Sequence, residues 1–404
     1  MGACILQAEY GFSDEETAAM IQELPYFQFF YSFSEYKDEP PFDPSLMVYF
    51  RKRLTPEILG EINEMIIRKV QAEKKEDHDE PNPPQNRGTL IVDATCAPAN
   101  IKYPQDTELL NEARENAEAI ISEMHDPSEG KKPRTYSRRA HKDHLNTTRK
   151  KKKTVQEIRK AIGKQLRYLR RDLCIIEVML SNGKNLSIQW EKRLKTIRML
   201  YEQQKHMYEN NTHKVENRIV SLSQPHLRPI VRGKAKAPVE FGAKLDISVM
   251  EGFVRLEKQS FEAYNEATLL KDVIERYKAR TGSYPKRILA DKIYRNRDNL
   301  AFCKAHDIRL SGPALGRPKK DAPRDRKQEY LDICERIEVE RKFSLAKRKC
   351  RLGLICTRLP ETTCSVIALS ILVLNLRKVL YALWLKWVAF YIHALSCENL
   401  PLVQ

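Results

Sequence analysis

Two short apolar runs that each end in an aspartate constrain the fold of this chain most. They are Thr89-Leu-Ile-Val-Asp93 and Lys286-Arg-Ile-Leu-Ala-Asp291. Runs of this length bounded by turn residues are typical of buried strands. Helical patterns alternate with strand patterns after each run, which predicts an α/β fold. Because the carboxyl ends of strands line the ligand crevice of open α/β sheets, Asp93 and Asp291 are candidate site residues.

The N-terminal segment carries start signals for three short helices. These are a capping box at Ser13-Asp-Glu-Glu16, then Asp43-Pro-Ser45 and Thr55-Pro56. Three helices with a tight turn before the third predict a helix-turn-helix-like DNA-binding module. A small helical packing domain is the alternative. In the first interpretation, phosphate contacts come from Arg51, Lys52 and Arg53.

A basic block and a helical hairpin interrupt the strand and helix pattern. Between Lys131 and Lys153 there are eleven Lys or Arg residues and one acid, so we expect a solvated arm that neutralises DNA phosphates. From Val155 the apolar residues follow steps of three and four, break at 181–185 and resume. This pattern predicts an antiparallel helical hairpin, packed on itself or on a second subunit.

These composition changes predict the domain organisation. We expect an N-terminal helical DNA-binding domain at 1–76, a linker at 77–88, the first part of the core at 89–124, an insertion at 125–225, the remainder of the core at 226–396 and a tail at 397–404. Alternating residues at 240–249 and 253–257 predict a β-hairpin in the second part of the core.

The charge of the chain indicates an acidic polymer as partner. Its formal net charge is +17, which favours nucleic acid over a membrane surface. The basic residues with which we expect DNA contact, beyond those of the N-terminal module, are Lys150, Lys151, Lys152, Lys153, Arg232 and Lys234. Apolar residues 365–396 are interrupted by Lys and Arg, so we interpret them as a buried helix that closes the core. Membrane attachment through this segment is a rival hypothesis.

A third carboxylate is indicated by the helix that precedes this segment. Arg336, Glu340 and Lys347 stand at offsets of 0, 4 and 11, which places them within roughly 40° on a helix. Two Asp and one Glu around a crevice suit Mg²⁺ and phosphoryl chemistry on nucleic acid. Helix capping by Asp and surface ion pairing by Glu are the alternatives for each residue alone.

Four strings resemble bacterial insertion-sequence transposases of the DDE class. CERIEVERKFSLAKRK, which contains Arg336, Glu340 and Lys347, is similar to the C-terminal signature of that family, except that Ile333 stands in place of its Tyr. LADKIYRNRDN resembles the second-Asp motif and LIVDATCAPANIKYP the first. PPFDPSLMVYFRKRL resembles the entry segment of the N-terminal transposase domain.

The resemblance implies an RNase H-like catalytic core with a helical insertion, in which Asp93, Asp291 and Glu340 bind two Mg²⁺ or Mn²⁺ ions. It implies hydrolysis of DNA at the element ends and strand transfer into target DNA, with Lys347 and Arg336 near the scissile phosphate. The implied partner is double-stranded DNA, bound by a homodimer or higher oligomer in the bacterial cytoplasm, with no membrane. The alternative is a catalytically inactive, decayed or truncated transposase that acts only as a DNA-binding protein.

Overall fold

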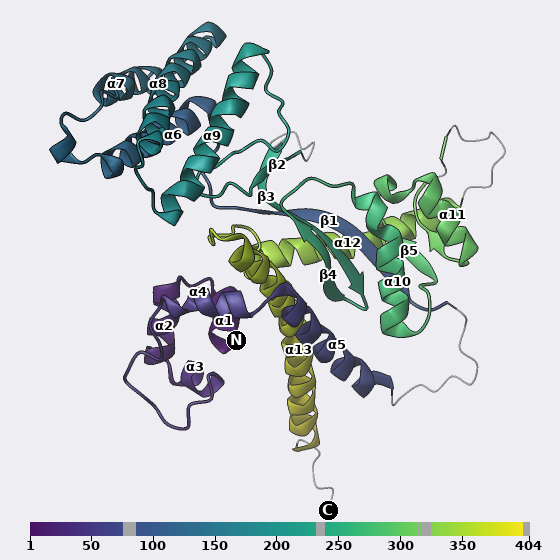
Figure 1. The fold of residues 1–404 in the computed structure, drawn as a ribbon. Coiled ribbons are helices and arrows are strands. Elements are labelled where there is room, and N and C mark those ends of the chain that lie inside the picture. The colour runs from purple at the N-terminus through teal and green to yellow at the C-terminus, as the bar shows by residue number, and fades with distance from the viewer. Residues whose placement is uncertain (76–85, 232–238, 314, 317–324, 399–404) are drawn as a thin grey trace, which may run out of the picture. The chain divides into compact units, whose positions relative to one another are not determined.

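The computed structural model describes residues 1–75, 86–231, 239–313, 315–316 and 325–398 (Figure 1). They form two compact units. Unit 1 contains residues 1–100 and 242–404, and unit 2 contains residues 101–241. Both ends of unit 2 therefore join unit 1, so unit 2 is an insertion in the sequence of unit 1. The fold is mixed α/β, as predicted from the alternating patterns.

Unit 1 begins with five helices. They are α1 (Gly2–Tyr10), α2 (Asp14–Glu23), α3 (Pro25–Phe30), α4 (Leu46–Arg53) and α5 (Pro56–Lys75). The predicted capping box is confirmed, because the Glu16 N–H donates to Ser13 Oγ at 3.1 Å and the Ser13 N–H donates to Glu16 Oε2 at 2.7 Å. Helix α1 was not predicted, since no side chain caps its N-terminus.

The described strands form one six-stranded sheet. Its strands are β1 (Thr89–Pro98), β2 (Arg228–Val231), β3 (Val239–Met250), β4 (Phe253–Ser260), β5 (Arg287–Leu289) and β6 (Arg309–Leu310). The order is β2-β3-β1-β5-β6, and β4 also pairs with β3. Strand β1 is antiparallel to β3 and parallel to β5, and β6 continues the parallel side. Strand β2 belongs to unit 2.

The predicted β-hairpin is confirmed, and its turn explains part of the sequence. Glu251 and Gly252 have φ of 51° and 74°, which suits the tight turns that follow the twist of paired strands. At the other end of β3, a Cβ on Gly242 would lie 2.0 Å from the Ala97 carbonyl oxygen. Glycine at this position lets β3 approach β1 closely.

Two expectations about the strand ends need correction. Strand β1 does not end at Asp93 but continues to Pro98, because its antiparallel pairing with β3 extends to Pro98 and Gly242. Asp93 is therefore an interior strand residue. Strand β5 ends at Leu289, and Asp291 caps the short 3-10 helix η3 (Lys292–Tyr294) that follows it.

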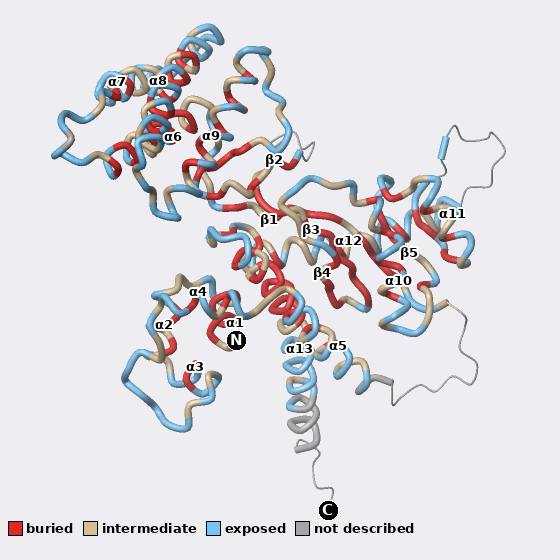
Figure 2. Tube along the Cα trace, in the orientation of Figure 1, coloured by how far each residue is buried: buried red, intermediate tan, exposed pale blue. Residues whose placement is uncertain are grey.

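Helices cover both faces of the sheet. Helices α10 (Leu270–Thr281), which follows the 3-10 helix η2 (Glu266–Leu269), and α11 (Arg297–Ala305) pack on the face that carries Leu90 and Val92. Helices α12 (Arg326–Lys349) and α13 (Pro360–Glu398), with the N-terminal helices, pack on the face that carries Ile91 and Ile247. In Figure 2 the buried residues, in red, lie mainly along the strands and along the parts of these helices that pack on them.

Helix α13 corrects the interpretation of residues 365–396 as a buried helix. Residues 367–374 are buried, whereas the large apolar side chains from Leu380 to Tyr391 are mostly exposed (Figure 2). Within the described part of the chain, residues 360–389 of α13 form the one helix long and apolar enough to cross a membrane, and half of its most apolar window is buried in the fold.

Unit 2 is a helical bundle with its own core. It contains α6 (Asp106–Met124), the 3-10 turn η1 (Pro127–Glu129), α7 (Ser137–Thr148), α8 (Val155–Ser181) and α9 (Ile188–Glu209). The predicted hairpin of α8 and α9 is confirmed and packs on α6 through Leu110, Leu169 and Ile197. Helix α6, which we expected in the core, lies in this bundle because its apolar face contacts α8.

The basic block is partly folded, which corrects the expectation of a solvated arm. Residues 137–148 form α7, and Ala140 in this helix is fully buried. Gln165 of α8 donates a hydrogen bond to the Ala140 carbonyl at 3.2 Å. Asp143 of α7 also pairs with Lys164 of α8 at 2.9 Å, whereas most of the basic side chains of α7 remain exposed.

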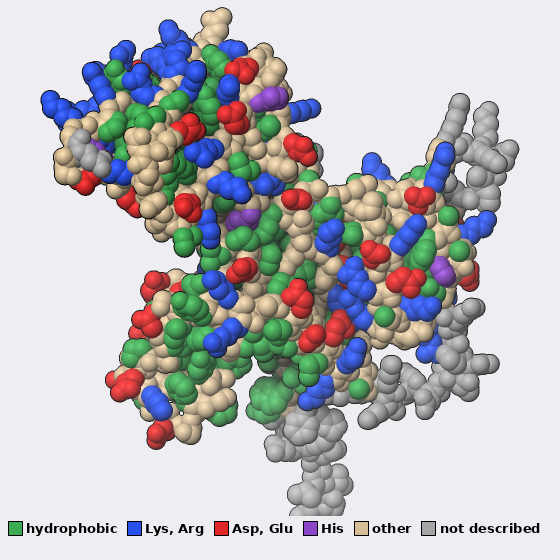
Figure 3. Space-filling view, in the orientation of Figure 1, with side chains coloured by type: hydrophobic (Ala, Val, Ile, Leu, Met, Phe, Trp, Pro, Cys, Tyr) green, Lys and Arg blue, Asp and Glu red, His purple; other side chains and the backbone are tan. Residues whose placement is uncertain are grey.

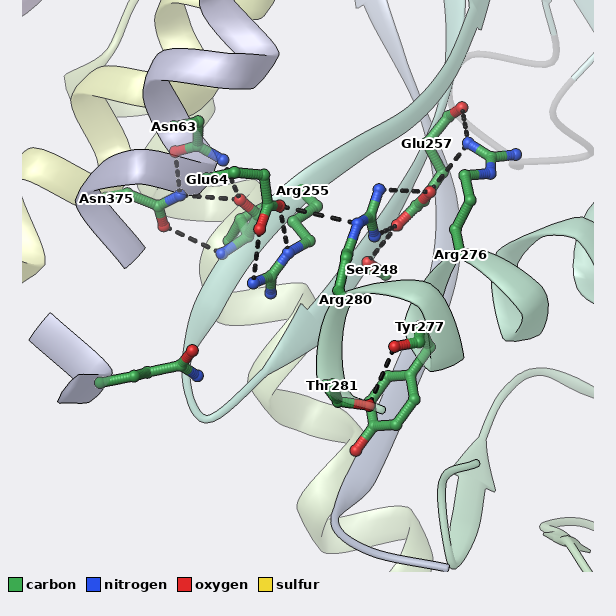
Figure 4. Close-up of polar contacts among 12 residues, drawn as sticks. Asn63, Glu64, Ser248, Arg255, Glu257, Arg276, Tyr277, Arg280, Thr281 and Asn375 are labelled. Carbon is green, nitrogen blue, oxygen red and sulfur yellow. Dashed lines mark hydrogen bonds and ion pairs between the residues drawn. The ribbon is translucent and has the colours of Figure 1, made fainter. Parts of the chain in front are cut away.

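A polar network ties α5, β4, α10 and α13 together in unit 1 (Figure 4). The Glu257 side chain is fully buried and pairs with Arg276 at 2.9 Å and Arg280 at 2.7 Å. Arg255 pairs with Glu64 of α5 at 2.5 Å. Asn375 of α13 accepts from the Val254 N–H at 2.9 Å and donates to its carbonyl at 2.7 Å.

We predict that Glu257→Gln lowers the free energy of unfolding by about 2 kcal/mol, because it leaves two arginines without their buried counter-charge. Urea denaturation followed by circular dichroism measures this loss. Glu262→Gln removes an exposed carboxylate from the same segment and serves as control. Equal midpoints for the two variants would show that the network contributes little to stability.

Candidate active site

One arginine joins two of the three predicted carboxylates. Arg336 Nη1 lies 3.2 Å from Asp93 Oδ2, and Arg336 Nη2 lies 3.4 Å from Glu340 Oε1. Asp93 comes from β1, whereas Arg336 and Glu340 lie one turn apart on α12. The expected alignment of Arg336 with Glu340 on one helix stripe is confirmed by their ion pair.

Two further arginines hold α12 on the sheet. Arg309 of β6 donates to both oxygens of Asp332 at 2.6 Å each, in a bidentate pair. Arg287 of β5 donates to Glu335 at 3.0 Å and to Thr89 Oγ1 of β1 at 2.7 Å. Burial raises the pKa of Asp332, but hydrogen bonds from Arg309 and Gln328 outweigh it and hold this pKa below its usual value. These contacts fix the helix that carries Glu340.

The Asp93 carboxyl group has an unusual proton affinity. Burial raises its pKa to about 6, against the lowering effect of the Ala94 N–H and of Arg336. The negative charges of Asp291 and Glu266 contribute smaller parts of this rise in the pKa. Asp291 is itself exposed and accepts the Lys292 N–H at 2.6 Å. Asp93 thus combines low solvation with neighbouring negative charge.

A buried acid on the opposite face of the sheet supports Asp291. Asp246 of β3 accepts hydrogen bonds from the hydroxyls of Tyr294, at 3.1 Å, and Tyr264. Burial raises the pKa of Asp246 in spite of these bonds. Because Tyr294 belongs to η3, its bond holds the turn that carries Asp291. We did not predict a role for Asp246 from the sequence. Its position as an acid inside the alternating run 240–249 was the pattern that could have indicated one.

The donor set suits a hard divalent cation. Carboxylate oxygens are the ligands that Mg²⁺ and Mn²⁺ prefer. A desolvated carboxylate beside other acids is stabilised by a cation, and Arg336 supplies one positive charge between Asp93 and Glu340. Among the residues that the structure describes, no three His, Cys, Asp or Glu side chains are grouped closely enough to hold a metal ion as they stand.

The predicted basic residues occupy different environments. Arg51 is buried and pairs with both oxygens of Asp14 at 2.7 Å, so it is a structural residue of the N-terminal helices, which argues against the expected phosphate contact. Lys52, Arg53, Lys151 and Lys152 are exposed, Lys153 and Lys347 are half-buried, and Lys150 pairs with Glu157 at 2.6 Å. Arg232 and Lys234 lie outside the described residues. Lys347 lies two turns beyond Glu340 on α12.

Comparison with known proteins gives two family matches. Residues 288–377 match the family described as transposase DDE domain, and residues 1–53 match the family described as transposase domain DUF772. The first match contains Asp291, Arg336 and Glu340, whereas Asp93 lies between the two matched segments. Unit 2 also lies between them.

One curated relative is the uncharacterized protein ORF8 in the nfe locus of Rhizobium meliloti. It is 32% identical over 109 residues, which cover 27% of this chain and 50% of that protein. The chain thus spans half the length of the relative. No solved structure matches the chain.

We predict that Asp93→Asn stabilises the metal-free protein at pH 7.5 by about 1 to 3 kcal/mol. The folded state binds the Asp93 proton more tightly than the unfolded state, so stability falls as pH rises from about 4 to about 6. The variant avoids this loss and should match the wild type near pH 3.

Urea denaturation in EDTA at both pH values measures the difference, with the exposed Asp298→Asn as control. A gain of the same size at both pH values would contradict the raised pKa.

Proposed function

We propose that the chain is an insertion-sequence DDE transposase, which cleaves DNA at insertion-sequence ends and joins them to target DNA; the matches to the transposase DDE domain and to the transposase domain DUF772 support this proposal. The observation that carries this proposal is the bridge from Arg336 to Asp93 and Glu340. Asp93 and Arg336 are separated by 243 residues, yet they meet on one face of the sheet. Ion pairing on a single helix explains Arg336 and Glu340, but it does not explain Asp93.

Asp93, Asp291 and Glu340 would hold Mg²⁺ or Mn²⁺ in this proposal. Such ions, when bound, activate the attacking oxygen and stabilise the leaving oxygen of a phosphoryl transfer. Asp93 gives up its proton on binding a cation, so we expect its affinity for the cation to fall below about pH 6. Its half-buried position on a central strand limits the directions in which its carboxylate can point.

The two basic side chains of α12 would act on the DNA phosphate. Arg336 has donors beyond the two that contact Asp93 and Glu340, and its planar fork suits two oxygens of a phosphate. Lys347 lies further along the same helix and would contribute a point charge to the flanking backbone. Both residues would position the scissile phosphate.

The architecture supports an RNase H-like assignment for the core of unit 1. Strand β1 has antiparallel strands on one side and parallel strands on the other, with helices on both faces. The N-terminal helices, through Lys52 and Arg53, and unit 2, through Lys150–Lys153, would bind double-stranded DNA as a homodimer or higher oligomer. We place this activity in the bacterial cytoplasm at the nucleoid.

A catalytically inactive DNA-binding protein is the second candidate. It is favoured by one observation, that the described carboxylates do not form a ready metal cage. The basic residues serve both candidates equally well. Metal-dependent cleavage therefore distinguishes them, whereas DNA binding does not.

We predict that Glu340→Gln reduces nicking of DNA that carries the flanks of this gene by more than about 100-fold in Mn²⁺. Loss of a direct ligand should exceed the roughly 10- to 100-fold effect of losing a residue that only orients a ligand. DNA affinity should stay unchanged, because phosphate contacts do not depend on this carboxylate. Gel analysis of end-labelled DNA measures the nicks.

Glu338→Gln is the matched control, because Glu338 lies on the same helix and pairs with Lys342 instead of the site. Equal nicking by wild type and Glu340→Gln would remove Glu340 from the catalytic set. Binding by the wild type without any nicking would favour the inactive candidate.

A further inference from the structure

Unit 2 contains a basic groove along the C-terminal half of α8. Its volume is about 1040 Å³, and no Asp or Glu is among its described lining residues. Six cationic residues line this groove, which we call the α8 groove: Lys131, Arg134, Arg167, Arg170, Arg171 and Lys184. Figure 3 shows Lys and Arg side chains gathered on the part of unit 2 formed by α7 and α8.

We propose that the α8 groove binds the phosphate backbone of double-stranded DNA, separately from Lys150–Lys153. This inference rests on the proposed function for its choice of DNA as the polyanion. It adds a second contact region on unit 2, which the sequence did not indicate.

The arginines of the α8 groove carry uncompensated charge. Among the described residues, Arg134, Arg167, Arg170 and Arg171 form no ion pair with a carboxylate. Elsewhere in unit 2 basic side chains do have acidic partners, such as Lys164 with Asp143 at 2.9 Å. Like charges lined up without counter-charges repel one another, so an anion in the groove is stabilising.

Two of these arginines are held in place. The guanidinium groups of Arg134 and Arg171 lie 4.4 Å and 4.6 Å from the centre of the Tyr136 ring. Tyr136 has a φ of 61°, a left-handed backbone that orients its ring at the start of α7. Stacking on an aromatic face reduces the conformational freedom that binding would otherwise remove.

The geometry favours phosphates of a long polyanion. The guanidinium fork matches two oxygens of a phosphate. Arg167 and Arg171 lie one helical turn apart, about 6 Å along the axis, with Arg170 beside them. Lys153 precedes α8, and a rise of about 1.5 Å per residue places Arg170 about 25 Å further along the helix. One turn of duplex, about 34 Å, is long enough to contact both regions, whereas a small phosphate compound is not.

The test compares two double variants of the full chain with equal loss of charge. Arg167→Gln with Arg170→Gln changes the groove, and Lys192→Gln with Lys195→Gln changes exposed residues of α9. Binding to a 30-base-pair duplex is measured in EDTA by fluorescence anisotropy at several salt concentrations. Circular dichroism confirms that the helices of both variants persist.

We predict that the groove variant lowers the slope of log affinity against log salt by about 1.8, because each DNA phosphate that is no longer neutralised lowers it by about 0.9. The α9 variant should retain the wild-type slope. Equal slopes for the two variants would overturn the proposal.

Sodium tripolyphosphate is the second probe. If it binds tightly and the groove variant loses only this binding, with duplex affinity unchanged, the groove is a site for small polyphosphates and the proposal fails. Because the assay contains no metal, groove-dependent DNA binding by a chain that never cleaves would support this inference while the proposed activity fails. If the wild type cleaves DNA but the groove variant binds DNA as tightly as the wild type does, the proposed activity is supported and the inference about the groove fails.

Discussion

The pairing of β1 on both edges is the constraint on which unit 1 depends. Strand β1 bonds to β3 along eight residue pairs and to β5 along three, so its backbone is satisfied inside the fold. Alternate side chains of β1 then enter two different cores, one under α10 and α11 and the other under α12 and α13. Asp93 is the half-buried residue between buried neighbours in this strand. Because β1 is paired on both sides, the backbone position of Asp93 is fixed by the sheet.

The charge of Asp93 destabilises the folded state. A carboxylate is desolvated there and faces other acids, which costs free energy at neutral pH. Arg336 offsets part of that cost. Arg309 and Arg287 of the neighbouring strands bond to α12 and so hold the helix that carries Arg336 against the sheet. Because one arginine does not balance the negative charge of these acids, the site is suited to bind a cation. Destabilised groups of this kind are common at functional sites.

Unit 2 separates its charges between core and surface. Arg114 is buried on α6 and bonds to Glu118 at 2.5 Å, while burial raises the pKa of Asp172 on α8 to about 8. The exposed side of α8 instead carries Arg167, Arg170 and Arg171 of the α8 groove. The apolar residues packed between α6, α8 and α9 stabilise this bundle, so that a strongly basic segment remains folded. A basic insertion can thus be a rigid surface instead of a solvated arm.

Local patterns of residues were sufficient to predict most of the individual helices and strands of this protein. The capping box at Ser13 predicted α2, and apolar steps of three and four predicted α8 and α9. Period-two alternation predicted β3 and β4, and the spacing of Arg336 and Glu340 placed them on one helix stripe. All of these patterns depend on neighbours a few residues away. The partner of Asp93, the burial of Arg51, the support from Asp246 and the α8 groove were decided by tertiary structure. Each joins segments distant in sequence, and their pairing depends on which apolar faces pack together, a choice that periodicity does not encode.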